Sequence, residues 1–144
     1  SGEKDLLPGV IENLTGNVLF HGIQVKPGMP TMLSMVKGTP VLSLSGNPFA
    51  VEALFEVLAG GYLTDKEASR YLQKNQMKAL KQTFVKTGKM KRIVKGRCDE
   101  SGVYLPQIQK NGQLKNGIGS NCLVIFPEGE RTYAEGEVVR VIRI

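Results

Sequence analysis

The chain has 144 residues, of which 41% are hydrophobic and 22% charged, and it carries a formal net charge of +6. This length allows one domain or two small ones, and this apolar content is typical of a folded globular protein. A membrane helix needs roughly 18 consecutive apolar residues, which the sequence never approaches, and no secretory signal is recognisable, so we expect a cytoplasmic protein without membrane contact. The two cysteines, Cys98 and Cys122, lack metal-site spacing and are too few for a disulfide framework, so we expect both to be reduced and semi-buried.

The first part of the chain shows helix and strand patterns in turn. A helix is predicted to begin near Pro8 and to end at Gly16. Strands are predicted over residues 18–25, 31–36 and 41–45, because these runs are apolar and are bounded by glycine and proline.

The turn of residues 46–48 is the most informative local motif. Asn47 is a favoured helix N-cap, and Pro48 fits the first helical position, so a helix is predicted over residues 48–59. A strand that turns directly into a helix aims backbone N–H groups and the positive end of the helix dipole at one point, which suits an oxyanion. An ordinary strand-turn-helix connection explains the same residues.

The loop of residues 26–30 is the second candidate element. Pro27 and Pro30 restrict the backbone, while Gly28 permits a turn that other residues would strain. This loop follows one predicted strand, as the turn of residues 46–48 follows another. If those two strands are parallel neighbours, the two loops meet at one edge of the sheet.

The second part of the chain has a different texture. Thr64 and Glu67 form a capping box, which predicts a helix running toward Leu80. From about residue 82, short strands alternate with glycine-rich turns, which indicates a small all-β unit. The predicted strands cover residues 83–85, 90–96, 103–107, 123–126 and 138–144.

The positive charge is concentrated in one stretch of this second part. Residues 86–97 contain six basic side chains and no acid: Lys86, Lys89, Lys91, Arg92, Lys95 and Arg97. Such a stripe attracts a phosphate-bearing ligand or forms a solvated strand face, and the sequence leaves both readings open. Nucleic acid is not favoured as a partner, because the stripe has no interleaved aromatic residue for base stacking.

Two of these motifs together resemble a known enzyme family. The segments are Lys26-Pro27-Gly28-x-Pro30 and Gly38-x-Pro40-Val41-x-x-Leu44-x-Gly46-Asn47-Pro48. In sequence and spacing they resemble the KPGKP…LPGNP pair of the molybdopterin molybdenumtransferases, the MoeA and gephyrin E-domain family. Residues 2–8 are similar to the tail of that family's acidic loop, and Gln109, residues 120–123 and residues 126–127 are similar to the close of its C-terminal domain.

The resemblance implies a fold and an activity. Residues 1–82 would be the C-terminal half of a three-layer α/β/α molybdopterin-binding domain, and residues 83–144 a small β-barrel domain, both from a longer protein. The family acts in molybdenum cofactor biosynthesis: its members bind adenylylated molybdopterin with Mg²⁺, insert metal from molybdate and release AMP. Further N-terminal domains and a homodimer are implied for the full-length protein.

The resemblance also implies site residues. The pterin nucleotide would contact residues of the two loops and of the β unit: Lys26, Pro27, Gly28, Ser45, Gly46, Asn47, Pro48, Lys95, Arg97 and Asn111. Asp5 matches an aspartate of the acidic loop, which implies a catalytic role and a ligand for magnesium. The residues themselves leave simpler readings open: a helix N-terminal acid for Asp5, and solvated surface cations for Lys26, Lys95 and Arg97.

The sequence departs from the family pattern at four places. Met29 stands where the family has a second lysine, Ser45 replaces a proline, and Phe49-Ala50 replaces a Val-Ser pair. Asn111-Gly112 occupies the place of a Ser-Ser pair that helps to hold molybdate in the family. These changes affect the molybdate pocket more than the pterin pocket. The alternative function is therefore a diverged pterin-binding or protein-interaction scaffold without metal insertion. For the 144 residues alone we expect little or no turnover.

Overall fold

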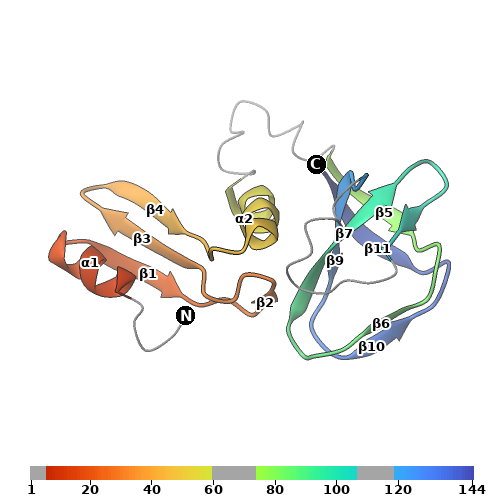
Figure 1. The fold of residues 1–144 in the computed structure, drawn as a ribbon, viewed down its shortest axis with the longest axis horizontal. Coiled ribbons are helices and arrows are strands. Elements are labelled where there is room, and N and C mark those ends of the chain that lie inside the picture. Colours follow the sequence, from red (N-terminus) through yellow and green to blue (C-terminus); the bar gives the residue numbers. More distant parts are fainter. Residues whose placement is uncertain (1–5, 60–73, 107–118) are drawn as a thin grey trace.

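The computed structural model describes residues 6–59, 74–106 and 119–144, which form mostly β-structure with few helices (Figure 1). Their strands lie in a three-stranded, a two-stranded and a six-stranded sheet. The predicted capping box at Thr64 and Glu67 lies outside the described residues. No helix in these three ranges is long and apolar enough to cross a membrane.

The first sheet is antiparallel and follows helix α1 (Leu7–Asn13). Its strands are β1 (Asn17–His21), β3 (Met32–Val36) and β4 (Thr39–Ser43), in the order β1-β3-β4. Both β1 and β4 pair with β3 and run antiparallel to it. They are therefore parallel to each other but are not neighbours, because β3 lies between them. The condition under which the two loops would meet, a pair of parallel neighbouring strands, is therefore not met within this sheet.

The strand predicted over residues 18–25 is two strands. The chain breaks at Gly22, whose φ of 89° is readily adopted only by glycine, and resumes as β2 (Val25–Lys26). Strand β2 leaves the first sheet and pairs in parallel with β7 (Lys91–Cys98) at the edge of the six-stranded sheet. Residues just before the loop of residues 26–30 thus belong to the sheet of the second part of the chain.

The six-stranded sheet has the order β2-β7-β9-β11-β5, and β8 (Val103–Tyr104) also pairs with β7. Its other strands are β9 (Cys122–Phe126), β11 (Val138–Arg143) and β5 (Asn75–Ala79). The expectation of helix as far as Leu80 is wrong from Asn75 onward, because β5 pairs along its whole length with β11. Tertiary pairing overrides the local helix preference there.

The second part is not a closed barrel in the portion that the structure describes. The path of paired strands runs from β2 to β5 without joining its ends, and β6 (Phe84–Lys86) pairs separately with β10 (Arg131–Tyr133). Strand β10 was not predicted, because it is only three residues long and two of them are exposed and polar. The division into two domains at residue 82 stays a prediction.

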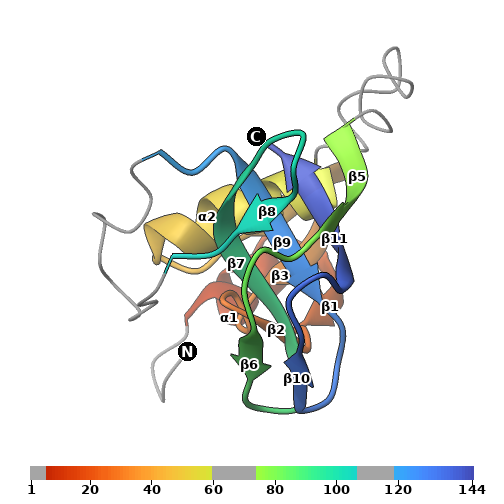
Figure 2. The same cartoon turned by 90° about the vertical axis from the view of Figure 1, so that its right-hand side faces the viewer.

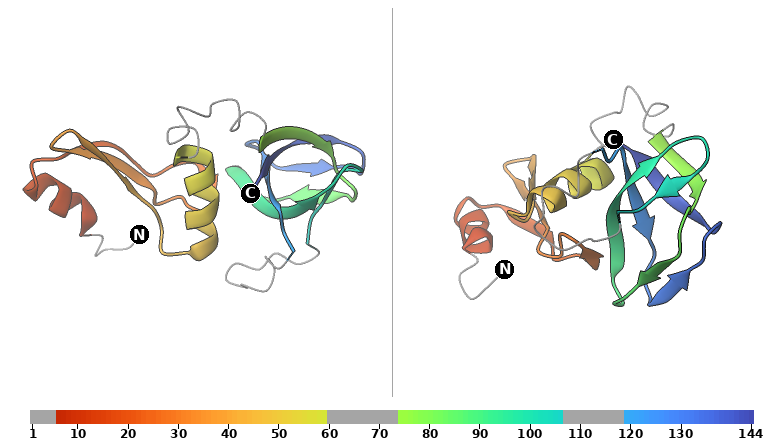
Figure 3. Two further views of the ribbon diagram at one scale, coloured as in Figure 1. Left: turned by 90° about the horizontal axis from the view of Figure 1, so that it is seen from above. Right: turned by 45° about the vertical axis from the view of Figure 1, so that its right-hand side comes forward.

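Helix α2 (Pro48–Leu54) stands between the two larger sheets, and a π-helical turn at Phe55–Ala59 continues it (Figure 3). It covers one face of the six-stranded sheet, while the other face forms a separate core. All five residues of β9 are buried because both faces of this strand are covered. The core under α2 contains Ala53, Leu54, Ile93, Leu123, Ile125 and Ile142.

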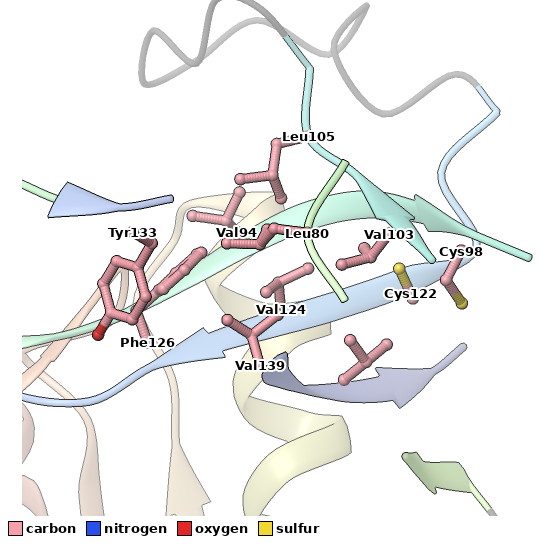
Figure 4. Close-up of a cluster of buried hydrophobic side chains, with 11 residues drawn as sticks. Leu80, Val94, Cys98, Val103, Leu105, Cys122, Val124, Phe126, Tyr133 and Val139 are labelled. Atoms are coloured by element: carbon pink, nitrogen blue, oxygen red, sulfur yellow. The ribbon is translucent and has the colours of Figure 1, made fainter. Parts of the chain in front are cut away.

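The core on the other face fills the second part of the chain (Figure 4). Phe126 stacks on Phe84 with ring centroids 4.5 Å apart and meets Tyr133 edge-on at 4.8 Å. The buried members of this core are Leu80, Val94, Cys98, Val103, Leu105, Cys122, Val124, Phe126, Tyr133, Val139 and Val141.

The loop of residues 26–30 rests directly on α2. Gly28 has a φ of 112°, and a Cβ atom at this position would overlap the side chain of the buried Leu54. The carbonyl of Gly28 accepts hydrogen bonds from the hydroxyl (2.7 Å) and the backbone N–H (3.1 Å) of Thr31. A glycine is therefore required here both by the backbone conformation and by the space available.

We expect the substitution Gly28→Ala to lower the free energy of unfolding by about 2 kcal/mol or more, because it combines an unfavourable φ with overlap against Leu54. Urea denaturation followed by circular dichroism measures this. Gly46→Ala is the matched control, since nothing lies within 4 Å of a Cβ there and its φ is not positive. Equal stability of the two variants would contradict the packing of the loop on α2.

The cysteine pair gives a pH prediction. Both thiols are free and more deeply buried than expected, and burial, followed by the neighbouring Cys98, raises the pKa of Cys122 to about 12. In an unfolded chain the thiol of a cysteine has a pKa of about 8.5. The folded state therefore holds the proton more tightly, and stability should fall as the pH rises from about 9 toward 12.

This loss is measured by chemical denaturation at a series of alkaline pH values. The variant Cys122→Ala should be less stable near neutrality yet lose less stability over the same alkaline range. Parallel pH profiles for the two proteins would contradict a buried, protonated Cys122.

Candidate functional site

Most of the predicted site residues lie in three places of the described structure. Asp5 and Asn111 lie outside the described residues. The loop of residues 26–30 and the turn of residues 46–48 both adjoin α2, and Lys95 and Arg97 lie on strand β7.

The turn of residues 46–48 caps α2 as predicted. The Asn47 side-chain oxygen accepts hydrogen bonds from the backbone N–H groups of Phe49 (3.0 Å) and Ala50 (3.2 Å). The N–H of Val51 donates to the backbone oxygen of Asn47, and Pro48 has no N–H to offer. The N–H groups of residues 49–51 are therefore used within the helix and its cap, and an oxyanion at this turn would depend on Gly46 and Asn47.

The loop of residues 26–30 is fixed at both ends. Lys26 is paired with β7 through β2, and the Ile23 N–H donates to the Met29 carbonyl at 2.9 Å. The peptide between Lys26 and Pro27 is cis. Lys26 itself is exposed, so a solution ligand can reach its ammonium group.

Lys95 is brought to the first turns of α2. Its ammonium nitrogen lies 2.5 Å from the Oε2 atom of Glu52 and 5.5 Å from the centroid of the Phe49 ring. The structure thus places Lys95 close to the turn of residues 46–48, as a common site requires. Glu52, which balances the charge of Lys95, was not singled out from the sequence, because a single acid on a helix surface carries no local signal.

Arg97 lies two residues further along β7, exposed and opposite Tyr104 of β8. The pKa of Asp99 is held below its usual range by hydrogen bonds from Ser101, and Arg97 adds a smaller effect. No contact of Arg97 with α2 is recorded in the part of the chain that the structure describes. A role of Arg97 in ligand binding stays a prediction.

The basic stripe does not form a single face. Lys86 is fully buried, and its ammonium group donates to the carbonyl oxygens of Gly88 (2.8 Å) and Gly129 (2.5 Å). Along β7 the residues alternate between the two faces of the sheet, so Lys95 and Arg97 share one face while Arg92 lies on the other. The stripe therefore divides into a structural lysine, an ion pair and a few exposed cations.

Magnesium cannot be placed on these residues. Within residues 6–59, 74–106 and 119–144 there is no group of three His, Cys, Asp or Glu side chains that would hold a metal ion. The carboxylate predicted for this role, Asp5, falls outside those ranges. A magnesium requirement stays an expectation from the resemblance.

The chain is similar to several known proteins over almost its whole length. It is 26% identical to a molybdopterin molybdenumtransferase of Staphylococcus aureus (strain COL), over 98% of this chain and 35% of that protein. A molybdopterin molybdenumtransferase of Staphylococcus epidermidis is 24% identical over the same shares. No protein-family model matches the chain.

Solved structures agree with this. A molybdopterin biosynthesis MoeA protein from Pyrococcus horikoshii superposes with a TM-score of 0.77 and 29% identity, over 96% of this chain and 34% of that one. The chain thus spans about a third of the length of the relatives it matches. The resemblance predicted from the two loop motifs is confirmed: the chain is similar to molybdopterin molybdenumtransferases over almost its whole length.

Proposed function

We propose that this chain acts in molybdenum cofactor biosynthesis, as part of a transferase that inserts metal from molybdate into adenylylated molybdopterin and releases AMP. The observation that carries this proposal is the similarity to molybdopterin molybdenumtransferases over 98% of the chain. It is supported by the two motif loops, since both adjoin the same helix, α2.

The proposed binding chemistry uses charge and shape from these elements. The pyrophosphate of the nucleotide and the molybdate ion are anions, and Lys26 offers a positive charge at the mouth of its loop. Pro27 and Gly28 fix the course of the loop, which meets α2 at Leu54, the last residue of the helix. Ser45, Gly46, Asn47 and Pro48 lead into the first turn of the same helix. Lys95 contributes from the face of β7 that α2 covers, where Glu52 holds it. Lys26 reaches the ligand from the edge strand β2, where its register with Arg92 puts it on the other face of the sheet.

The rest of the catalytic apparatus is assigned to other parts of a longer protein. The relatives are about three times as long as this chain, since it covers 35% of the first of them. We infer that N-terminal domains and a second subunit complete the site, with Asp5 and Mg²⁺ near the reacting group. A cytoplasmic location belongs to the same proposal.

A second candidate function is a protein-interaction module. The observation that favours it is a set of exposed apolar side chains on α1 and β1: Leu7, Val10, Leu14 and Leu19, the last 53% exposed. Contiguous exposed apolar patches mark protein-interaction or ligand-binding surfaces. The departures at Met29 and Ser45 agree with this candidate, since they affect the predicted molybdate pocket.

Binding of the pterin nucleotide separates the two candidates. In calorimetric titration with adenylylated molybdopterin and magnesium, the wild-type chain should bind, and Lys26→Ala should weaken binding by about tenfold or more, because a charge-assisted hydrogen bond is lost. Lys89→Ala, another exposed lysine, should bind as wild type. Equal binding by Lys26→Ala and wild type would contradict the role of Lys26. No binding by this chain, followed by no binding by the full-length protein in the same titration, would favour the interaction module.

Turnover gives an independent prediction. We expect the isolated 144-residue chain to release no AMP above the uncatalysed rate, because it spans only a third of its relatives' length. Chromatographic assay of AMP after incubation with adenylylated molybdopterin, molybdate and magnesium tests this. Release of AMP over many turnovers would show that these residues are sufficient for catalysis.

A further inference from the structure

Strands β2 and β7 place two cations side by side. In this parallel pair Val25 is in register with Lys91, and Lys26 is in register with Arg92. Figure 2 shows β2 along the lower end of β7. Because β2 is the edge strand of the sheet, the pair of Lys26 and Arg92 lies at that edge.

The two side chains lie on the same face of the sheet. Residues in register on neighbouring strands share a face, and Val25 packs with Ile93 in the core under α2. Lys26 and Arg92 therefore share the opposite face, where Arg92 is also in register with Phe126 of β9. Arg92 is thus flanked across the sheet by a cation on one side and by a buried aromatic ring on the other.

Like charges in register across two strands destabilise a sheet unless something compensates them. Other cations in the structure have acidic partners: Lys74 pairs with Glu56, Lys95 with Glu52, and Arg131 with Glu137. Among the residues described, neither Lys26 nor Arg92 makes an ion pair. The pair is a local excess of positive charge next to the motif loop.

We propose that Lys26 and Arg92 together bind one oxyanion group, a phosphate or a molybdate, with Arg92 as a binding residue beyond those predicted from the sequence. The identity of the natural ligand rests on the proposed function, whereas the pairing of the two cations does not. The planar guanidinium presents two parallel donors to two oxygens of a tetrahedral anion, while the lysine supplies a point charge. Arg92 is half-buried, which strengthens its interaction with an anion relative to a fully solvated side chain.

The test uses inorganic pyrophosphate and molybdate in separate calorimetric titrations of the 144-residue chain. The variants are Arg92→Gln and Lys26→Gln, and the matched control is Lys91→Gln, an exposed neighbour whose side chain lies on the opposite face. For at least one of the two anions, both site variants should weaken binding about tenfold or more, and the control less than twofold. No binding by the wild type, or equal losses in site variants and control, would overturn the proposal.

Thermal unfolding separates a binding role from a structural one. Without anion, Arg92→Gln should unfold at the same temperature as wild type or higher, because one of two repelling charges is removed. Saturating anion should raise the unfolding temperature of the wild type but not that of the variant. A variant that is less stable without anion yet still stabilised by it would overturn the proposal.

The two proposals fail in distinguishable ways. If adenylylated molybdopterin binds to the chain but Arg92→Gln weakens the binding of neither pyrophosphate nor molybdate, the proposed function stands and the anion pair is wrong. If Lys26 and Arg92 bind pyrophosphate or molybdate but the chain does not bind the pterin nucleotide, the anion site stands and the proposed function is wrong.

Discussion

The packing of helix α2 between two sheets determines most of what the candidate site can be. Its small residues Ala50 and Ala53 are fully buried, and Leu54 is nearly so, which lets the helix lie close to the six-stranded sheet. The loop of residues 26–30 approaches the same helix closely only because residue 28 has no side chain. Loop, helix cap and Lys95 are thus held by one element, and a shift of α2 would displace all three.

Local sequence signals predicted the elements that depend on neighbouring residues. The cap at Asn47, the helix start near Pro8 and the strands over residues 31–36 and 123–126 follow from proline, glycine and apolar spacing, and the structure contains them within a residue or two. The two loop motifs also sufficed to predict the family resemblance, which the similarity over 98% of the chain confirms.

What the sequence did not predict depends on partners distant in the chain. Asn75–Ala79 is a strand because β11 pairs with it, and nothing in its own five residues indicates this. The N–H groups of Phe49 and Ala50 are taken by the Asn47 side chain, the same residue that predicts the helix start, and the sequence did not reveal this use of them. The partners of Lys95 and Lys86 likewise come from other elements, so a run of basic residues could not reveal which charges are neutralised.

The short strand β2 also has a consequence for how the chain reaches its folded form. Its two residues pair with Lys91 and Arg92, which follow much later in the chain, so the contact closes a long loop containing most of the first sheet and all of α2. Contacts between distant segments form late, since the entropy of closing the loop must be lost before the pairing stabilises it. During synthesis the segment around Lys26 therefore stays without its final neighbour until β7 has emerged, and the anion-binding edge is among the last features of the molecule to assemble.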